Sequence, residues 1–166
     1  PNYEVRQEFE AAIADTSWKE VTSALEHSEN LLAHLFNGDE EDVATNVAEV
    51  HEQNTSILKY NDENSLACVL SLAFYTARNR YEMIRELPTG KGFADIVLLP
   101  YRHVDAPAIV LELKWNNDAD TAISQIKLQG YGKSLMHYVG DVILVGINYD
   151  KQTKVHSCKI EKIVKK

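Results

Sequence analysis

Apolar side chains recur every three or four positions through most of the first half of the chain. This spacing predicts amphipathic helices over residues 16–37, 40–53 and 62–79. A Thr-Ser pair can cap the start of the first helix, and an Asn-Gly-Asp turn ends it. The second helix is acidic in its first turn, which the helix dipole favours. Packing is sufficient to explain the apolar faces of all three helices.

The pattern changes to strand-like runs after the third helix. Apolar runs bounded by turn residues predict strands over residues 81–87, 94–99, 108–115, 141–149 and 154–163. A loop of Asn and Asp residues can cap one further helix, over residues 121–130, between the third and fourth strands. The fourth strand is rich in β-branched residues, so we expect it to be buried on both faces. The order of elements predicts an α/β fold preceded by N-terminal helices.

The length of 166 residues suits one domain, with or without a helical annex, and is sufficient for a hydrophobic core. No apolar run approaches the ~18 residues that a membrane-spanning helix needs, so we expect no membrane association. Two cysteines are too few for a disulfide framework, and they favour buried thiols in a reducing, cytoplasmic compartment. Because the sequence begins at Pro1, we expect it to be a fragment of a longer chain.

The net charge of −8 is unevenly distributed, and so it does not exclude a nucleic-acid partner. Residues 1–60 contain 13 acidic and 3 basic side chains, whereas residues 61–166 contain 12 acidic and 14 basic ones. A polyanion can therefore approach the second part of the chain. From this change in charge we predict a helical extension over residues 1–60 and a separate domain over residues 61–166.

Three charged residues lie inside two neighbouring apolar strands. Asp95 lies near the start of one predicted strand, and Glu112 and Lys114 lie two positions apart in the next. Because side chains alternate along a strand, Glu112 and Lys114 point to one face, and Asp95 can reach that face when the two strands pair. The structural alternative is an isolated Glu–Lys ion pair on an exposed strand face.

Two carboxylates within an apolar strand pair are costly to bury unless a cation compensates them. Mg²⁺ and similar hard cations prefer oxygen ligands, and such a metal can activate a water for attack on a phosphate ester. A lysine beside the metal can orient or deprotonate that water, or bind a phosphate oxygen. Asp95, Glu112 and Lys114 are therefore candidates for the hydrolysis of phosphodiester bonds.

Two polar residues outside the strands are further candidates, each with a structural alternative. Glu63 lies in the first turn of the third predicted helix, where the helix dipole alone favours an acid, but it can also be a metal or water ligand. Gln125 lies among apolar residues of the last predicted helix, either as a satisfied hydrogen-bonding group or as a residue that orients a carboxylate or phosphate. Histidine and cysteine spacings predict no metal site, and no Walker-type loop or Gly-x-Ser-x-Gly motif is present.

Sequence segments around these residues resemble the PD-(D/E)XK nuclease superfamily. The resemblance rests on residues 92–100, which contain Asp95, on residues 109–115, which contain the Glu-Leu-Lys triplet, and on Gln125 and Tyr131. It extends to the nuclease-like domain found after an AAA-type ATPase-like domain in bacterial proteins. The likeness covers the region from about residue 60 to residue 135.

The resemblance implies a restriction-endonuclease-like α-β-β-β-α-β core with a central mixed sheet. It implies Mg²⁺ or Mn²⁺ as the cofactor, and an AAA-type ATPase-like domain of the same parent chain as a partner. The metal-binding and catalytic residues that it implies are Asp95, Glu112, Lys114, Glu63 and the main-chain carbonyl of Leu113. The polar motif that it implies for the following helix consists of Gln125 and Tyr131.

Three functions fit these observations. The first is a metal-dependent nuclease, for which we expect DNA rather than RNA as the substrate. The second is a non-catalytic nucleic-acid-binding or regulatory module attached to the ATPase-like domain, which metal binding through Asp95 would distinguish from the first. The third is an interaction module over residues 1–60, whose acidity suits a basic partner.

Overall fold

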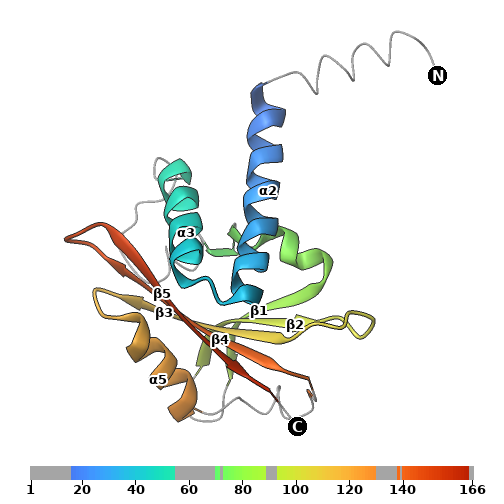
Figure 1. The fold of residues 1–166 in the computed structure, drawn as a ribbon, viewed down its shortest axis with the longest axis vertical. Coiled ribbons are helices and arrows are strands. Elements are labelled where there is room, and N and C mark those ends of the chain that lie inside the picture. Colours follow the sequence, from blue (N-terminus) through green and yellow to red (C-terminus); the bar gives the residue numbers. More distant parts are fainter. Residues whose placement is uncertain are drawn as a thin grey trace.

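A five-stranded sheet forms the centre of the part of the chain that the structure, a computed structural model, describes (Figure 1). The described residues are 16–54, 70–71, 73–88, 93–129, 138 and 140–164. The strands are β1 (Tyr81–Pro88), β2 (Phe93–Pro100), β3 (Ala108–Trp115), β4 (Val142–Asp150) and β5 (Val155–Ile163). Each strand agrees with its predicted range to within one residue at either end, so the apolar runs located all of them.

The strands lie in the sheet in their sequence order. β1, β2 and β3 form an antiparallel meander, β3 and β4 are parallel, and β5 returns antiparallel to β4. A tight turn cannot join parallel strands, and helix α5 (Ala119–Gln129) supplies the crossover between β3 and β4. This mixed sheet with its crossover helix confirms the predicted α/β, restriction-endonuclease-like core preceded by N-terminal helices.

Helices cover both faces of the sheet. α2 (Thr16–Asn37) and α3 (Glu40–Asn54) lie on one face, and α5 lies on the other (Figure 1). Neighbouring residues of β3 serve opposite faces, because Ile109 joins the core under α2 and α3 whereas Val110 joins the core under α5. β4 is buried over almost its whole length, which confirms the expectation of a strand covered on both sides. No described helix is both long enough and apolar enough to cross a bilayer.

A glycine turn and one carboxylate fasten the N-terminal helices to the sheet. Gly38 has a positive φ of 88°, and its N–H donates a hydrogen bond to the carbonyl of His34, which ends α2 and allows α3 to begin. The Glu40 carboxylate then accepts a hydrogen bond of 2.9 Å from the main-chain N–H of Ile160 in β5. This contact holds the start of α3 against the edge strand of the sheet.

The third predicted helix is interrupted. Residues 70, 71 and 73 are α-helical, but Tyr75–Asn79 form the 3₁₀ helix η1, so the prediction of a continuous α-helix up to residue 79 is wrong. The Ser28 hydroxyl accepts hydrogen bonds from the main-chain N–H and the hydroxyl of Thr76, at 2.9 and 2.8 Å. This contact withdraws one amide from the α-helical pattern, and the following turns close over three residues instead of four. Residues 62–69 of the predicted helix lie outside the described part of the chain.

Candidate functional site

β2 and β3 bring the three predicted charged residues to one face of the sheet. The pairing of the two strands ends at Ile96 opposite Leu111, and the next residues are Asp95 on β2 and Glu112 on β3. The side chains two positions further into each strand belong to the core under α5, so alternation places Asp95, Glu112 and Lys114 on the α5 face. The predicted juxtaposition of Asp95 with the Glu–Lys pair is therefore present in the fold.

Short polar contacts fix these side chains. The main-chain N–H of Leu113 donates a hydrogen bond of 2.7 Å to Oδ2 of Asp95, so the carboxylate of one strand is bound to the backbone of the next. The Nζ atom of Lys114 lies 3.2 Å from Oε1 of Glu112. The Glu112 side chain is only 2% exposed and that of Lys114 is 14% exposed, so this ion pair is largely removed from water. Lys114 thus compensates part of the cost of burying Glu112.

The charge and the donor atoms of this group fit a hard divalent cation. Two carboxylates and one ammonium carry a formal charge of −1 among these three side chains, which favours a further cation. Carboxylate and carbonyl oxygens are the donors that Mg²⁺ and Mn²⁺ accept, and Leu113 offers its carbonyl between Glu112 and Lys114 in the sequence. The partly buried Asp95 and Lys114 border the solvent, from which an ion and a substrate can approach.

Two residues of β4 that the sequence analysis did not select also shape the site. Gly146 lies opposite Glu112 in the parallel pair, and a Cβ atom there would overlap the main-chain carbonyl of Ala119 in the first turn of α5. The glycine therefore allows α5 to begin directly over the site. Asn148 lies opposite Lys114, is 4% exposed, and accepts a hydrogen bond of 3.0 Å from the main-chain N–H of Asn117. The signals in the sequence that could have indicated these two residues are a lone glycine and a lone asparagine inside an apolar, β-branched strand.

The loop after β3 caps α5 close to these charges. Asp118 accepts hydrogen bonds from both the main-chain N–H and the hydroxyl of Thr121, which is the geometry of a helix N-cap. The hydrogen bond from the Thr121 main-chain N–H lowers the pKa of Asp118 below its usual value, and the bond from the Thr121 hydroxyl adds to that effect. The loop of Asn and Asp residues thus caps the helix as predicted, although α5 begins two residues earlier than expected.

The structure places the remaining predicted site residues less directly. Gln125 is half-buried on α5 and, within the described part of the chain, forms no hydrogen bond with Asp95, Glu112 or Lys114. Glu63 and Tyr131 lie outside the described residues, and their roles stay predictions. The described site therefore consists of the charged groups of β2 and β3, the Leu113 backbone and the start of α5.

A second group of potential metal ligands lies at the turn between α2 and α3. Single ligand atoms of His34, Asp39 and Asp42 lie within 4.8 Å of one another, a juxtaposition that the histidine spacing in the sequence does not predict. The Nδ1 atom of His34 is 3.4 Å from the Asp39 carboxylate and 3.6 Å from that of Asp42. Acidic side chains at the start of a helix and a histidine at the end of another are favoured by the helix dipoles, which accounts for this group without an ion.

Comparison with protein families identifies the fold around the charged residues. The family model of the PD-(D/E)XK nuclease superfamily matches residues 61–159, which include all of β1 to β4 and α5. The chain belongs to the PD-(D/E)XK nuclease superfamily. A search of curated proteins gave no significant match. Membership of this superfamily confirms the resemblance seen in the sequence.

The family assignment sets the broad class of activity. PD-(D/E)XK proteins are nucleases, so the assignment indicates a nuclease whose substrate is a nucleic acid. Nucleases of this superfamily generally use divalent metal ions, in agreement with the donor atoms described above. The matched region begins after α2 and α3, at residue 61. The association with an AAA-type ATPase-like domain stays a prediction.

Proposed function

We propose that this chain is a deoxyribonuclease that depends on Mg²⁺ or Mn²⁺ and uses Asp95, Glu112 and Lys114. The observation that supports it most strongly is the meeting of these three side chains on one face of β2 and β3, in a chain of the PD-(D/E)XK nuclease superfamily. A bound ion would neutralise charge on the phosphate and lower the pKa of a water molecule used for attack.

Each residue of the group has a distinct part in this proposal. Asp95 and Glu112 would hold the ion through their carboxylates, and the main-chain carbonyl of Leu113 would be a further ligand. The Leu113 N–H keeps the Asp95 carboxylate oriented, because it occupies one carboxylate oxygen at 2.7 Å. Lys114, whose Nζ atom contacts Glu112 at 3.2 Å, would instead contact the attacking water or a phosphate oxygen when substrate is bound.

The proposal extends to the residues that complete the site. Gln125 lies on α5, above the same face of the sheet, and would support the substrate phosphate or a carboxylate. Glu63 would be a further ligand from the helix that precedes the sheet, and Tyr131 would complete the polar motif after α5. Replacing Gln125 by Ala is expected to lower the rate of hydrolysis less than replacing Lys114, because Gln125 is neutral and would support the site by hydrogen bonds alone.

The proposal is tested by measuring hydrolysis of labelled single-stranded and double-stranded DNA, and of RNA of the same sequence, with Mg²⁺, with Mn²⁺ and with EDTA. We expect metal-dependent cleavage of DNA, slower cleavage of RNA, and a loss of about 10³-fold in Lys114→Met. Lys162→Met, which removes an exposed lysine of β5 at the other end of the sheet, is the matched control and should cleave at the wild-type rate. Cleavage that continues in EDTA, or that survives in Lys114→Met, would contradict the proposal.

One observation favours a second candidate function, a non-catalytic nucleic-acid-binding or regulatory module. The Lys114–Glu112 ion pair compensates part of the cost of burying the carboxylate without any bound ion, as a structural pair would. This alternative predicts nucleic-acid binding without hydrolysis and no binding of Mn²⁺ that depends on Asp95. The same assays on the wild-type chain therefore separate the two functions.

The wider setting is also part of the proposal. We infer a reducing, cytoplasmic location, because Cys158 is a free thiol whose burial raises its pKa to about 12 and makes it unreactive. The association with an AAA-type ATPase-like domain in a bacterial parent chain, and the boundary between residues 1–60 and 61–166, rest on the sequence resemblance and the change in charge. Limited proteolysis of the full parent chain, followed by mass spectrometry, would test both.

A further inference from the structure

The end of the sheet away from the charged site carries exposed arginine and aromatic side chains. β2 leads from Asp95 to Pro100, and the loop after it meets the turn after η1, where the N–H of Tyr101 donates a hydrogen bond of 3.0 Å to the carbonyl of Arg80. We call this group the Arg–Tyr patch. Its members are Tyr75, Arg78 and Arg80 from η1 and the turn after it, and Tyr101, Arg102 and His103 from the loop after β2.

The aromatic rings of the Arg–Tyr patch are presented to solvent. Tyr75 is 55% exposed and Tyr101 is 40% exposed, although large aromatic side chains are usually buried. The guanidinium of Arg78 lies 5.7 Å from the centre of the Tyr75 ring. The rings of Tyr101 and His103 stack with centres 6.0 Å apart and an angle of 7° between their planes. Each tyrosine is thus held by a neighbour while much of its surface stays open.

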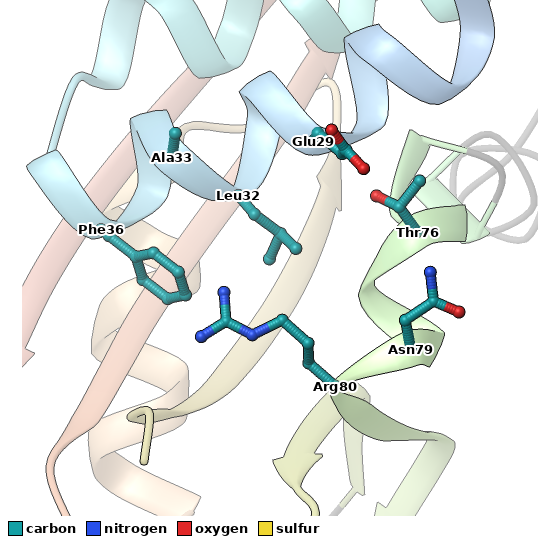
Figure 2. A pocket seen from close by; sticks show the side chains of 7 residues that line it. All are labelled: Glu29, Leu32, Ala33, Phe36, Thr76, Asn79 and Arg80. Carbon is teal, nitrogen blue, oxygen red and sulfur yellow. The ribbon is translucent and has the colours of Figure 1, made fainter. Parts of the chain in front are cut away.

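A groove between α2 and η1 adjoins the patch through Arg80 (Figure 2). It has a volume of about 370 Å³, and it is lined by Glu29, Leu32, Ala33, Phe36, Thr76, Asn79 and Arg80. Figure 2 shows the Arg80 side chain reaching across the groove toward Phe36, and the guanidinium lies 5.9 Å from the centre of that ring. Glu29 is the one carboxylate among the lining residues, and it lies at the Thr76 end, away from Phe36.

The chemistry of the patch matches that of an unpaired nucleic-acid strand. Exposed tyrosine rings offer surfaces on which bases stack, and arginines beside them offer positive charge to phosphates. Stacking of this kind requires bases that are not already paired within a duplex. Arg78, Arg80 and Arg102 supply three positive charges, and the acids on the adjoining segments are Asp105 in the loop after β2, Glu82 in β1 and Glu29 in the groove.

We propose that the Arg–Tyr patch binds a single-stranded segment of the nucleic acid, with bases on Tyr75 and Tyr101 and phosphates at Arg78, Arg80 and Arg102. The proposal rests on the proposed function in that the ligand is a nucleic acid. Pro100 lies five positions after Asp95 in β2, which corresponds to about 17 Å along the strand. The patch therefore holds the substrate at a distance from the scissile bond and contributes to affinity, not to the chemical step.

Binding in the absence of metal tests this proposal without relying on cleavage. Fluorescence anisotropy of a labelled 20-nucleotide single strand in EDTA gives the dissociation constant for each variant. We expect Tyr75→Ala and Tyr101→Ala each to weaken binding about tenfold, and Tyr75→Phe and Tyr101→Phe to bind like the wild type, because the rings are kept. Arg78→Ala should make the slope of log association constant against log salt concentration less steep by about 0.7. The control Lys151→Ala should not change this slope. Thermal unfolding verifies that each variant is folded.

The outcomes separate this proposal from the proposed function. Three results would each overturn the proposal for the patch. They are a wild-type chain that does not bind the single strand, alanine variants that bind it like Lys151→Ala, and equal affinity for a poly-glutamate of the same length. Such a result together with metal-dependent cleavage would leave the nuclease proposal intact. Patch-dependent binding without any cleavage would support the patch and contradict the nuclease proposal.

Discussion

At the scale of single residues, the burial of Glu112 dominates the energetics of the site. Its side chain is 2% exposed, and the Lys114 ammonium lies 3.2 Å from it. An ion pair in such surroundings adds little net stability, but the loss of one partner leaves a charge that neither water nor protein compensates fully. The site therefore has a built-in requirement for positive charge beside Glu112, which a lysine or a divalent ion can meet.

Lys114→Met tests this requirement through stability. We expect the variant to lose about 3 kcal/mol of unfolding free energy, because methionine fills similar space without the charge. Millimolar Mn²⁺ should raise its melting temperature more than that of the wild type, since the ion replaces the missing charge. Lys151→Met serves as the control. A Lys114→Met protein as stable as the control, with or without Mn²⁺, would contradict this account.

The sequence located the charged residues of the site but not their support. Strand alternation was sufficient to place Asp95, Glu112 and Lys114 on one face, because both strands were recognisable from their apolar runs. The need for Gly146 arises from the approach of α5 to β4, and that distance is set by the packing of distant parts of the chain. Such a contact cannot be derived from local sequence.

At the scale of elements, the contact between α3 and the sheet contains two buried histidines. His51 of α3 lies 5.2 Å, ring to ring, from His156 of β5, and both rings contact Tyr149 of β4. Burial lowers the pKa of His156 to about 4, and the nearby His51 adds to this shift. Burial also lowers the pKa of His51, although Glu52 opposes that effect. Both rings are therefore neutral in the folded protein at neutral pH.

This pair makes stability dependent on pH. In the unfolded chain histidine has a pKa of about 6.5, so the unfolded state takes up protons first as the pH falls. The stabilisation is complete above about pH 6.5 and is lost progressively toward pH 4, by roughly 3 kcal/mol for His156. His156→Phe should flatten this part of the profile, whereas the exposed-site control His103→Phe should not. Chemical denaturation between pH 4 and 8 measures the effect, and an unchanged profile in His156→Phe would refute it.

Element boundaries show where local sequence ceases to be sufficient. The five strands and α5 follow from apolar runs and caps that lie within a few residues of each boundary. The end of the third helix does not, because it depends on the hydrogen bonds between Thr76 and Ser28, which are 48 positions apart in the sequence. The helical spacing of apolar residues in the sequence continues through η1. The contact between Thr76 and Ser28 is what selects the tighter 3₁₀ turn.

At the scale of the whole molecule, the N-terminal helices share a core with the sheet. Leu31, Leu35 and Val47 from α2 and α3 are buried in the same cluster as Leu111 of β3 and Val145 of β4. The family match nevertheless begins at residue 61, and the sequence predicts a boundary near residue 60. The shared core indicates that the sheet needs the helices to keep its fold, whereas a boundary near residue 60 indicates that it does not.

Removal of residues 1–60 distinguishes these views. We expect the shortened chain to lose its cooperative thermal transition and to bind the dye ANS, because the apolar face of the sheet under α2 and α3 becomes exposed. The point variant Leu35→Ala should lose about 3 kcal/mol, and Glu26→Ala on the exposed side of α2 should lose little. A shortened chain that melts cooperatively and cleaves DNA would show that the helices are a separate extension.

The central claim, that Asp95 and Glu112 hold a divalent ion, is tested most directly by calorimetric titration of Mn²⁺. The titration compares His34→Ala, in which the group at the α2–α3 turn is disabled, with the same protein carrying Asp95→Asn or Asp105→Asn. Asparagine keeps an oxygen for the Leu113 N–H while removing the charge. We predict binding in His34→Ala and in the Asp105→Asn control, and its loss in Asp95→Asn. Equal binding in all three proteins, or none at millimolar Mn²⁺, would contradict the claim.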